Sequence, residues 1–350
     1  MVENANAGAK QSMSARHTTP TLDDVAQLAQ VSTATVSRCL NAPDRVSKDT
    51  RQRVMQAVDR LGYTPNFGAR VMAAKRTYTI GAIIPTMENA IFARGLQAFQ
   101  EALHARGYTL LVSSTSYSPE VEAEQVRALV ARGADGLLLI GHERDPAIYQ
   151  YMAQQNVPAL VAWAYSEREA QPSIGFDNRA AMRGLAEQVL DLGHVRIGVV
   201  SAVSQGNDRA TQRLLGIKEA LSARGLNTEN LNVIETPYGI ENGRTAFEQL
   251  MALDRRPSVV MCGNDVLAAG ALQGARAMGL KVPEDVSVTG FDDIELAQIV
   301  TPSLTTVHVP HRDMGHKAAE ELVRLVETGQ PGPSVELPVT LQRRQSLGPA

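Results

Sequence analysis

From Tyr78 onward the chain alternates short apolar runs with segments of helical spacing. Most of these runs are apolar at nearly every position and do not alternate with polar residues. This pattern is typical of parallel strands with helices on both faces of their sheet. Right-handed crossovers then predict doubly wound sheets, and a chain of 350 residues is too long for a single core, so we expect two lobes. The predicted strands are residues 80–85, 108–114, 136–141, 158–163, 196–202, 232–237, 258–264, 286–292 and 304–310.

A pair of short helices is predicted ahead of this region. Apolar side chains recur at i, i+3, i+4 and i+7 from Leu22, and Thr21 is placed to cap this first helix. After a three-residue break, Ser32 is placed to cap a second helix. Val36 and Leu40 share the inner face of that helix, so the two segments form a helix-turn-helix pattern.

The outer face of the second helix is small, hydroxylic and basic, which suits a helix that lies in the major groove of DNA. Arg38 can donate two hydrogen bonds to guanine, and Thr33 and Ala34 can contact a thymine methyl group. Thr35 and Ser37 suit phosphate contacts. The alternative is an ordinary helical hairpin with a polar face. The predicted DNA contacts of this region are Thr21, Thr33, Ala34, Thr35, Ser37 and Arg38.

A third helix is predicted after Ser47, with Val54, Val58 and Leu61 on one face and Gly62 at its end. Three short helices can close a small core, and we call this predicted DNA-binding domain, residues 20–64, the head.

The charge of the chain divides near residue 78. Residues 1–78 contain eleven Lys and Arg against six Asp and Glu, a net charge of +5, although the whole chain has a net charge of -3. The remainder therefore has a net charge of -8, and only the first part suits a polyanionic partner.

The segments on either side of the head have a different character. Residues 1–19 are polar and without periodicity, which predicts a disordered tail, and Met13 is an alternative start. Residues 65–78 form a predicted hinge with helix-forming and basic residues but with Gly68 in the middle. Glycine costs about 1 kcal/mol relative to alanine in a helix, so we expect this segment to order only on DNA.

Several other classes of protein are disfavoured by the sequence. No apolar run has the length of a membrane span, about 18 residues, and no apolar signal region begins the chain, which predicts a cytoplasmic protein. Cys39 and Cys262 belong to no CxxC pair, and Pro310 separates His308 from His311, so we predict no metal site. Phosphate-loop and hydrolase motifs are missing, and we predict neither a cofactor nor an enzyme.

The chain contains two sets of short motifs, one in the head and one further along. They are T-L-D-D-V-A at 21–26, V-S-x-x-T-V-S-R at 31–38, V-S-x-x-T-R at 46–51, L-G-Y-x-P-N at 61–66, G-N-D at 263–265, V-S-V-T-G-F-D-D at 286–293 and P-x-L-T-T-V at 302–307. With both sets, the chain resembles the lactose and galactose repressor family of bacterial transcription regulators. The resemblance covers about residues 20–345, and the head motifs are highly specific.

This resemblance implies a homodimer whose two heads read the half-sites of a near-palindromic operator DNA. It also implies an effector-binding core of the periplasmic-binding-protein type at residues 79–345. The N-terminal subdomain of that core would comprise residues 79–177 and 307–333, and the C-terminal subdomain residues 178–306 and 334–345. The end of the chain has no leucine heptad, which favours a dimer over a tetramer joined by a coiled coil.

In the family, the hinge becomes a helix in the minor groove, where a leucine wedges into the central base step. Here Met72 stands at that place, and methionine is apolar and pliable enough to wedge. Because methionine replaces leucine here, the sequence does not predict how strongly the DNA would bend. The alternative to a wedge is that Met72 is an ordinary surface residue of a linker. Asn66 and Ala69 are the other hinge residues predicted to contact DNA.

Ligands of open parallel sheets bind at the carboxyl ends of the strands. Polyols need planar hydrogen-bonding groups and an aromatic face, and residues of both types follow the predicted strands. Residues at three matching positions commonly hold the effector in the family, and the resemblance implies the same role for Arg213, Asn264 and Asp292. The predicted effector contacts are Asn89, Phe92, Trp163, Arg213, Asn264 and Asp292.

Each of these contacts has a structural alternative. Asn264 and Asp292 could cap the helices that follow them, and Trp163 could be a core residue. Arg213 could form a buried ion pair with Asp292 without any ligand. Residues 177–178, at the end of another short apolar segment, favour a turn.

Together these features predict a repressor of carbohydrate or sugar-acid catabolic genes that a small-molecule effector, a sugar or sugar acid, releases from DNA. A corepressor-dependent regulator of the same family is one alternative, since the sequence does not decide the sign of the response. A solute-binding protein or sugar-converting enzyme is the alternative from another class, and the missing export signal and basic head oppose it.

Overall fold

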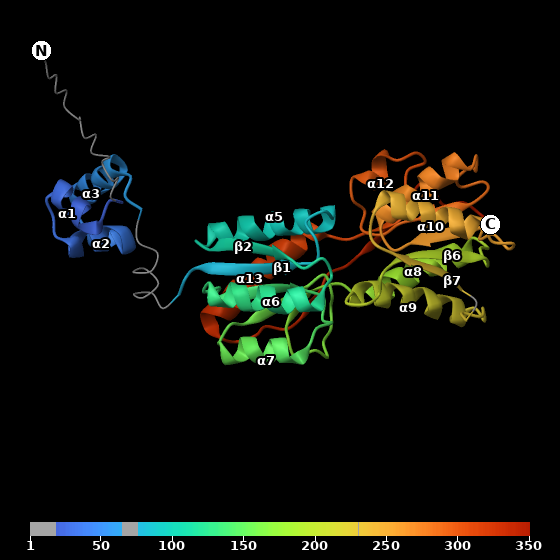
Figure 1. Cartoon of the computed structure of the whole chain (residues 1–350), viewed down its shortest axis with the longest axis horizontal. Helices are drawn as coiled ribbons and strands as arrows, with labels where there is room; N and C mark the ends of the chain where they lie inside the picture. The colour runs from blue at the N-terminus through green and yellow to red at the C-terminus, as the bar shows by residue number, and fades with distance from the viewer. Residues whose placement is uncertain (1–18, 65–75, 230) are drawn as a thin grey trace, which may run out of the picture. The chain divides into compact units, whose positions relative to one another are not determined.

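The structure is a computed structural model that describes residues 19–64, 76–229 and 231–350. The chain divides into two compact units between Thr77 and Tyr78, and we call the second one the core unit (Figure 1). The predicted tail up to residue 18 lies outside the described residues, as do the hinge residues Asn66, Ala69 and Met72.

Capping residues begin the helices of the head where the sequence predicts them. The Thr21 hydroxyl accepts a hydrogen bond from Asp24 N (3.3 Å), and Thr21 N donates to Asp24 Oδ2 (2.8 Å). Ser32 and Ser47 cap the next two α-helices, and Gly62 ends the last one in the left-handed conformation (φ 63°). The elements are α1 (Leu22–Ala29), α2 (Thr33–Asn41), the 3-10 helix η1 (Pro43–Arg45) and α3 (Lys48–Leu61).

The three helices of the head close one small apolar core. Val25, Val36 and Val54, one from each α-helix, have no exposed surface and meet at its centre. Leu22, Leu40, Val46 and Leu61, which also belong to the predicted core, are partly buried around it.

The first lobe of the core unit is built on a six-stranded sheet in the order β11-β5-β4-β3-β1-β2. All of its strand pairs are parallel, as predicted. The strands are β1 (Thr79–Ile84), β2 (Thr109–Ser114), β3 (Gly136–Ile140), β4 (Ala159–Ala162), β5 (Ser173–Gly175) and β11 (Val335–Glu336), and the helices are α5 (Ala90–Ala105), α6 (Pro119–Ala131), α7 (Pro146–Gln154) and α13 (His311–Thr328).

Helices cover both faces of this sheet (Figure 1). Side chains of α5 and α13 share one apolar cluster with one face, and side chains of α6 and α7 share another with the opposite face. The crossing of α5 and α13 is close because both helices have glycine there. A Cβ atom on Gly315 would lie 2.0 Å from the Gly95 carbonyl oxygen, so only glycine fits.

The second lobe repeats the arrangement with a four-stranded parallel sheet in the order β7-β6-β8-β9. The pair α8 and α9 packs on one face and the pair α10 and α11 on the other. The elements are β6 (Ile197–Ala202), β7 (Asn232–Thr236), β8 (Val259–Cys262), β9 (Ser287–Thr289), α8 (Asn178–Asp191), α9 (Asp208–Ala223), α10 (Ile240–Met251), α11 (Asp265–Ala277) and α12 (Leu296–Ile299).

Three details of the sequence prediction are wrong. The last predicted strand, β10 (Thr306–His308), pairs antiparallel with β12 (Thr340–Gln342) in a separate two-stranded sheet. The short strands β5, β11 and β12 were missing from the prediction because two or three residues are too few to show a periodic pattern. Val335 and Glu336 pair with β5 of the first lobe, so residues 334–345 do not all belong to the C-terminal subdomain.

Candidate functional site

The second helix of the head presents the side chains predicted to contact DNA. Val36 and Cys39 are buried, which fixes the opposite side of α2 as the accessible one. On that side Ala34 and Arg38 are exposed, and the hydroxyl side chains of Thr33, Thr35 and Ser37 are half-buried. A helix with this face can lie in a major groove with its small side chains near the bases.

Two of the hydroxyl groups predicted to contact DNA already take part in helix caps. The Thr21 hydroxyl donates to Asp24 Oδ2 (2.7 Å), and this bond lowers the pKa of the Asp24 carboxyl. Thr35 Oγ1 lies 2.9 Å from the Ser32 hydroxyl, which also accepts a hydrogen bond from Thr35 N (3.2 Å). These contacts order the start of each helix and leave Arg38 as the most direct candidate for reading a base.

The basic side chains of the described head are all exposed. They are Arg38, Arg45, Lys48, Arg51, Arg53 and Arg60. Five acidic side chains accompany them between residues 19 and 64, so most of the positive surplus of residues 1–78 comes from outside the described head. The described surface is therefore mixed in charge.

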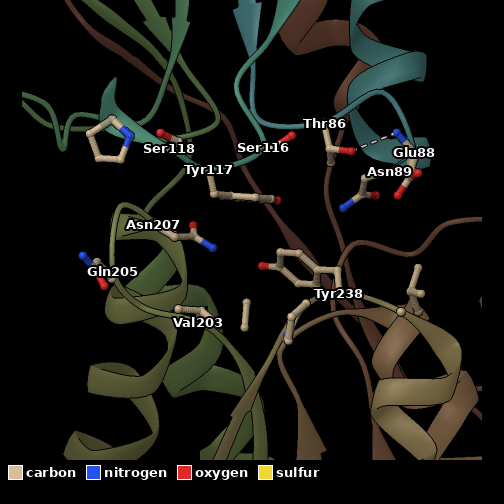
Figure 2. A pocket seen from close by; sticks show the side chains of 15 residues that line it. Thr86, Glu88, Asn89, Ser116, Tyr117, Ser118, Val203, Gln205, Asn207 and Tyr238 are labelled. Atoms are coloured by element: carbon tan, nitrogen blue, oxygen red, sulfur yellow. Dashed lines mark hydrogen bonds between the residues drawn. The ribbon is translucent and has the colours of Figure 1, made fainter. Parts of the chain in front are cut away.

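The core unit contains a cavity of about 660 Å³ at the carboxyl ends of strands from both lobes. Residues after β1 and β2 supply the wall of the first lobe, and residues after β6 and β7 supply that of the second (Figure 2). The lining consists of Thr86, Glu88, Asn89, Ser116, Tyr117, Ser118, Pro119, Ala202, Val203, Gln205, Asn207, Pro237, Tyr238, Gly239 and Val266. This is the position where ligands bind to open parallel sheets.

Of the six predicted effector contacts, Asn89 lines the cavity. Its Oδ1 accepts a hydrogen bond from Ile91 N (3.2 Å) and so caps α5. Phe92 and Trp163 are almost fully buried, with ring centroids 5.4 Å apart. Trp163 Nε1 donates to His311 Nδ1 (3.2 Å), and the tryptophan belongs to the apolar core of the first lobe instead of the cavity wall.

Arg213 and Asn264, which belong to the second lobe, are buried and do not line the cavity. Arg213 Nε donates to Asn178 Oδ1 (3.0 Å), and Arg213 Nη1 donates to the Gly263 carbonyl (2.6 Å). The guanidinium also lies 4.3 Å from the centre of the Phe291 ring. Asn264 caps α11 by accepting from Leu267 N (2.9 Å), which is the structural alternative anticipated for this residue.

Asp292 is buried close to these groups. Burial raises the pKa of its carboxyl to about 7, although the positive charge of Arg213 lowers it. Within the described part of the chain the two residues make no ion pair. Burial also raises the pKa of the Tyr117 hydroxyl, and the charges of Arg213 and Asp292 act on it too, so the cavity wall and the buried groups are electrostatically coupled.

The sequence prediction missed the residues that contribute most of the cavity wall. Tyr117 and Tyr238 follow β2 and β7, and Gln205 and Asn207 follow β6. The rule that ligands bind at the carboxyl ends of strands covers these loops as well. Arg213, which the family motifs indicate, is buried and does not line the cavity.

Hydrogen bonds join the two lobes beside the cavity. Arg209 Nη1 donates to the Ile140 carbonyl (3.1 Å), and His142 N donates to Asp208 Oδ2 (2.6 Å). Asp208 and Arg209 also pair with each other at 2.8 Å. Burial raises the pKa of Asp208, but the charge of Arg209 and the bond from His142 N outweigh it, so the pKa lies below its ordinary value.

The described residues lack two other kinds of feature. No helix there has both the length and the apolar character needed to cross a membrane. Over the same ranges, no three His, Cys, Asp or Glu side chains are grouped so that they could hold a metal ion.

The chain is similar to known proteins along most of its length. Residues 21–66 match the family described as "Bacterial regulatory proteins, lacI family", and residues 186–347 match a "Periplasmic binding protein-like domain". Catabolite control protein A of Priestia megaterium is 30% identical over 93% of this chain and 98% of the relative. The HTH-type transcriptional repressor CytR of Escherichia coli (strain K12) is 33% identical over 87% of this chain and 89% of the relative.

The fold is also that of a solved regulator. The lac repressor dimer bound to operator and the anti-inducer ONPF matches with a TM-score of 0.83 and 28% identity, over 94% of this chain and 99% of that chain. This match confirms the predicted fold class, a helical head followed by two parallel-sheet lobes.

Proposed function

The chain belongs to the lacI family of bacterial regulatory proteins, and we propose that it represses transcription by binding a near-palindromic operator as a homodimer. In this proposal it acts in the cytoplasm and by binding rather than by catalysis. A small molecule in the cavity of the core unit controls its affinity for DNA.

The accessible face of α2 is the observation that carries the proposal. Arg38 is exposed there beside small side chains, and a bidentate contact between arginine and guanine contributes about 1–3 kcal/mol of discrimination. Ala34, Thr33, Thr35 and Ser37 would approach the bases and phosphates around it. In the hinge, Asn66, Ala69 and Met72 remain predicted minor-groove contacts.

A gel shift with palindromic DNA from upstream of the protein's own gene tests the reading helix. The Arg38→Ala variant is expected to bind at least about tenfold more weakly, with the same fold by circular dichroism. Arg183→Ala is the matched control, because Arg183 is an exposed arginine of the core unit that pairs with Glu187 four residues away. Unchanged operator binding by Arg38→Ala would contradict the proposal.

For the effector we propose the cavity at the strand ends, with Asn89 in its wall and the buried Arg213, Asn264 and Asp292 as further predicted contacts. Phe92 and Trp163 would support Asn89 and the start of α5 from the core. A ligand that prefers one arrangement of the lobes shifts the population toward it, and a ten- to hundredfold change in operator affinity needs about 1.4–2.8 kcal/mol of coupling.

A measurement can also decide whether the bound ligand lowers or raises the affinity for the operator. We propose induction, in which the ligand lowers operator affinity. The corepressor alternative gives the opposite shift, so an operator titration with and without the bound ligand separates the two.

A further inference from the structure

The start of α9 in the second lobe lies against the strand ends of the first lobe. A loop joins β6 to α9, and Asp208 and Arg209 follow it in the first turn of the helix. A Cβ atom on Gly206, in that loop, would lie 3.1 Å from the Tyr117 carbonyl oxygen, so the loop contacts the segment after β2. Asp208 and Arg209 contact the segment after β3, and we call these two residues the bridging pair.

The bridging pair bonds to backbone groups of the first lobe. His142 N donates to Asp208 Oδ2 (2.6 Å), and Arg209 Nη1 donates to the Ile140 carbonyl (3.1 Å). Arg209 Nη1 also donates to Asp208 Oδ1 (2.8 Å), so the two side chains hold one another in place. Hydrogen bonds with an ionised partner are stronger than neutral ones, and both bonds to the first lobe are of this kind.

A glycine of the first lobe makes room for the bridging pair. Gly141 lies between the two backbone groups and has a left-handed conformation (φ 74°). A Cβ atom there would lie 2.0 Å from Arg209 Nη1 and 2.3 Å from Asp208 Oδ1. Any side chain at this position would therefore push the pair away from the backbone of the first lobe.

The carboxyl of the bridging pair is ionised at neutral pH. Burial raises the pKa of Asp208, yet the charge of Arg209 and the hydrogen bond from His142 N bring it below its ordinary value. The contacts between the lobes thus favour the charged form of the pair, and its attraction does not depend on a proton near neutral pH.

The order of the strands places this contact between the crossovers and the cavity. The chain passes between the lobes from β5 to α8, from α12 to α13 and from β11 to β12. The three crossovers lie together, because Phe176, Val307 and Leu337, one from each, line a common groove. In the first sheet β5 and β11 lie at one edge, β3 lies two strands from β5, and β1 and β2 lie beyond it. A rotation about the crossovers that widens the cavity therefore has to separate the bridging pair from the first lobe.

The lobes also share an ion pair that is open to water. Arg94 Nη2, on α5, lies 2.6 Å from Glu295 Oε1, just before α12, and these side chains are 39% and 85% exposed. The side chains of Arg209 and Asp208 are 6% and 19% exposed. Since water and salt weaken exposed ion pairs, the bridging pair is the stronger of the two connections.

From these contacts we infer that Asp208 and Arg209 form a latch that holds the two lobes of the core unit closed. Opening the lobes breaks both hydrogen bonds to the first lobe. A ligand that prefers the closed arrangement then binds a chain already held in that form, whereas one that prefers the open arrangement has to break the latch. The role of the ligand rests on the proposed function, and the latch itself does not.

Double electron–electron resonance on the full chain measures the opening. Nitroxide labels at Ala153→Cys on α7 and Ser222→Cys on α9 are both exposed and report the distance between the lobes. Cys39 and Cys262 are buried, which directs the label to the introduced thiols. Labelled chains are mixed with an excess of unlabelled chains, so that distances within one chain dominate.

Asp208→Ala and Arg209→Met are each expected to raise the ratio of long to short distances at least about tenfold, because hydrogen bonds to charged groups are lost. Glu295→Ala removes the exposed pair and is the matched control, with an expected change below about threefold. Unchanged distances in both Asp208→Ala and Arg209→Met overturn the inference. This holds even if Tm falls, because an ordinary structural ion pair stabilises the fold without holding the lobes closed.

Gly141→Ala tests the same contact from the first lobe. Its Cβ meets the bridging pair, so the distances should lengthen, whereas Gly184→Ala, whose Cβ meets no atom within 4 Å, should leave them unchanged. Unchanged distances in Gly141→Ala also count against the latch. These measurements need neither operator nor ligand, so a failed latch leaves the proposed function intact, and a wild-type chain that binds no operator leaves the latch standing.

Discussion

In the head, the predicted DNA-reading face lies on a single helix, α2, whereas the cavity of the core unit is lined by separate segments between Thr86 and Val266. The shape of the α2 face depends on three short helices packed around one small core. The shape of the cavity depends on the spacing of two lobes, since Tyr117 and Tyr238 belong to different ones. A ligand can therefore change the cavity by moving lobes, while the α2 face keeps its local structure.

The two units also differ in the size of their cores. The head buries a few small and branched side chains, and a domain of this size has a small margin of stability. The core unit buries apolar side chains on both faces of two sheets. A loss of equal free energy is therefore expected to unfold a larger fraction of the head than of the core unit.

The largest effect is expected from Gly315→Val in the core unit. Its Cβ would lie 2.0 Å from the Gly95 carbonyl oxygen, which belongs to the backbone of α5 and cannot rotate away. Such overpacking is expected to destabilise the core unit by about 3 kcal/mol. Calorimetry should show a lower transition temperature for the core unit and an unchanged transition for the head, which would confirm that the two units fold separately.

Gly184→Ala is the matched control for this substitution. Gly184 lies inside α8, and a Cβ there meets no atom within 4 Å. Alanine should therefore stabilise the core unit by about 0.5–1 kcal/mol through helix propensity. Equal destabilisation by both variants would refute the close crossing of α5 and α13 as the cause.

A smaller effect, specific to the core unit, is expected from Asp292. The pKa of its carboxyl is raised by burial to about 7 from 3.8, so between these values the folded state binds a proton that the unfolded state has lost. Stability linked to this group therefore falls as pH rises through this interval and levels off above it. From pH 5.5 to pH 8 the loss is about 2 kcal/mol.

Denaturant titrations at the two pH values measure this loss. Asp292→Asn should remove it, whereas the control Asp191→Asn, at an exposed carboxyl paired with Arg224, should keep it. A wild-type chain whose stability rises from pH 5.5 to pH 8, with the same rise in Asp292→Asn, would show that Asp292 is ionised throughout.

The same contrast explains what the sequence could predict. Caps at Thr21, Ser32 and Ser47 were predictable because a cap depends on residues three positions apart. The parallel strands were predictable because burial on both faces makes each run apolar. The pairing of β11 with β5 joins residues far apart in the sequence and involves only two residues of β11, so no local pattern indicates it.

The cavity was harder to predict because its wall is assembled mainly from four loops, with Val266 of α11, and only its position at the strand ends follows from the fold. Asn89 was predicted and lines it. Whether a polar residue near a strand end faces the cavity or the interior depends on side-chain packing, which no local pattern reveals. Arg213 and Asp292 are buried and do not line the cavity, whereas Tyr117 does.

The smallest effect is expected from Thr21→Ala in the head. The Thr21 hydroxyl donates to Asp24 Oδ2 (2.7 Å) and accepts from Asp24 N (3.3 Å), so its single proton is already donated within the cap of α1. Loss of this cap should destabilise the head by about 1 kcal/mol, as should Ser47→Ala at the start of α3. Operator affinity, measured below the melting temperature of the head, should then fall equally in both variants. A clearly larger fall in operator affinity for Thr21→Ala than for Ser47→Ala would contradict this expectation. It would mean that the Thr21 hydroxyl leaves Asp24 and donates to a DNA phosphate when the head binds.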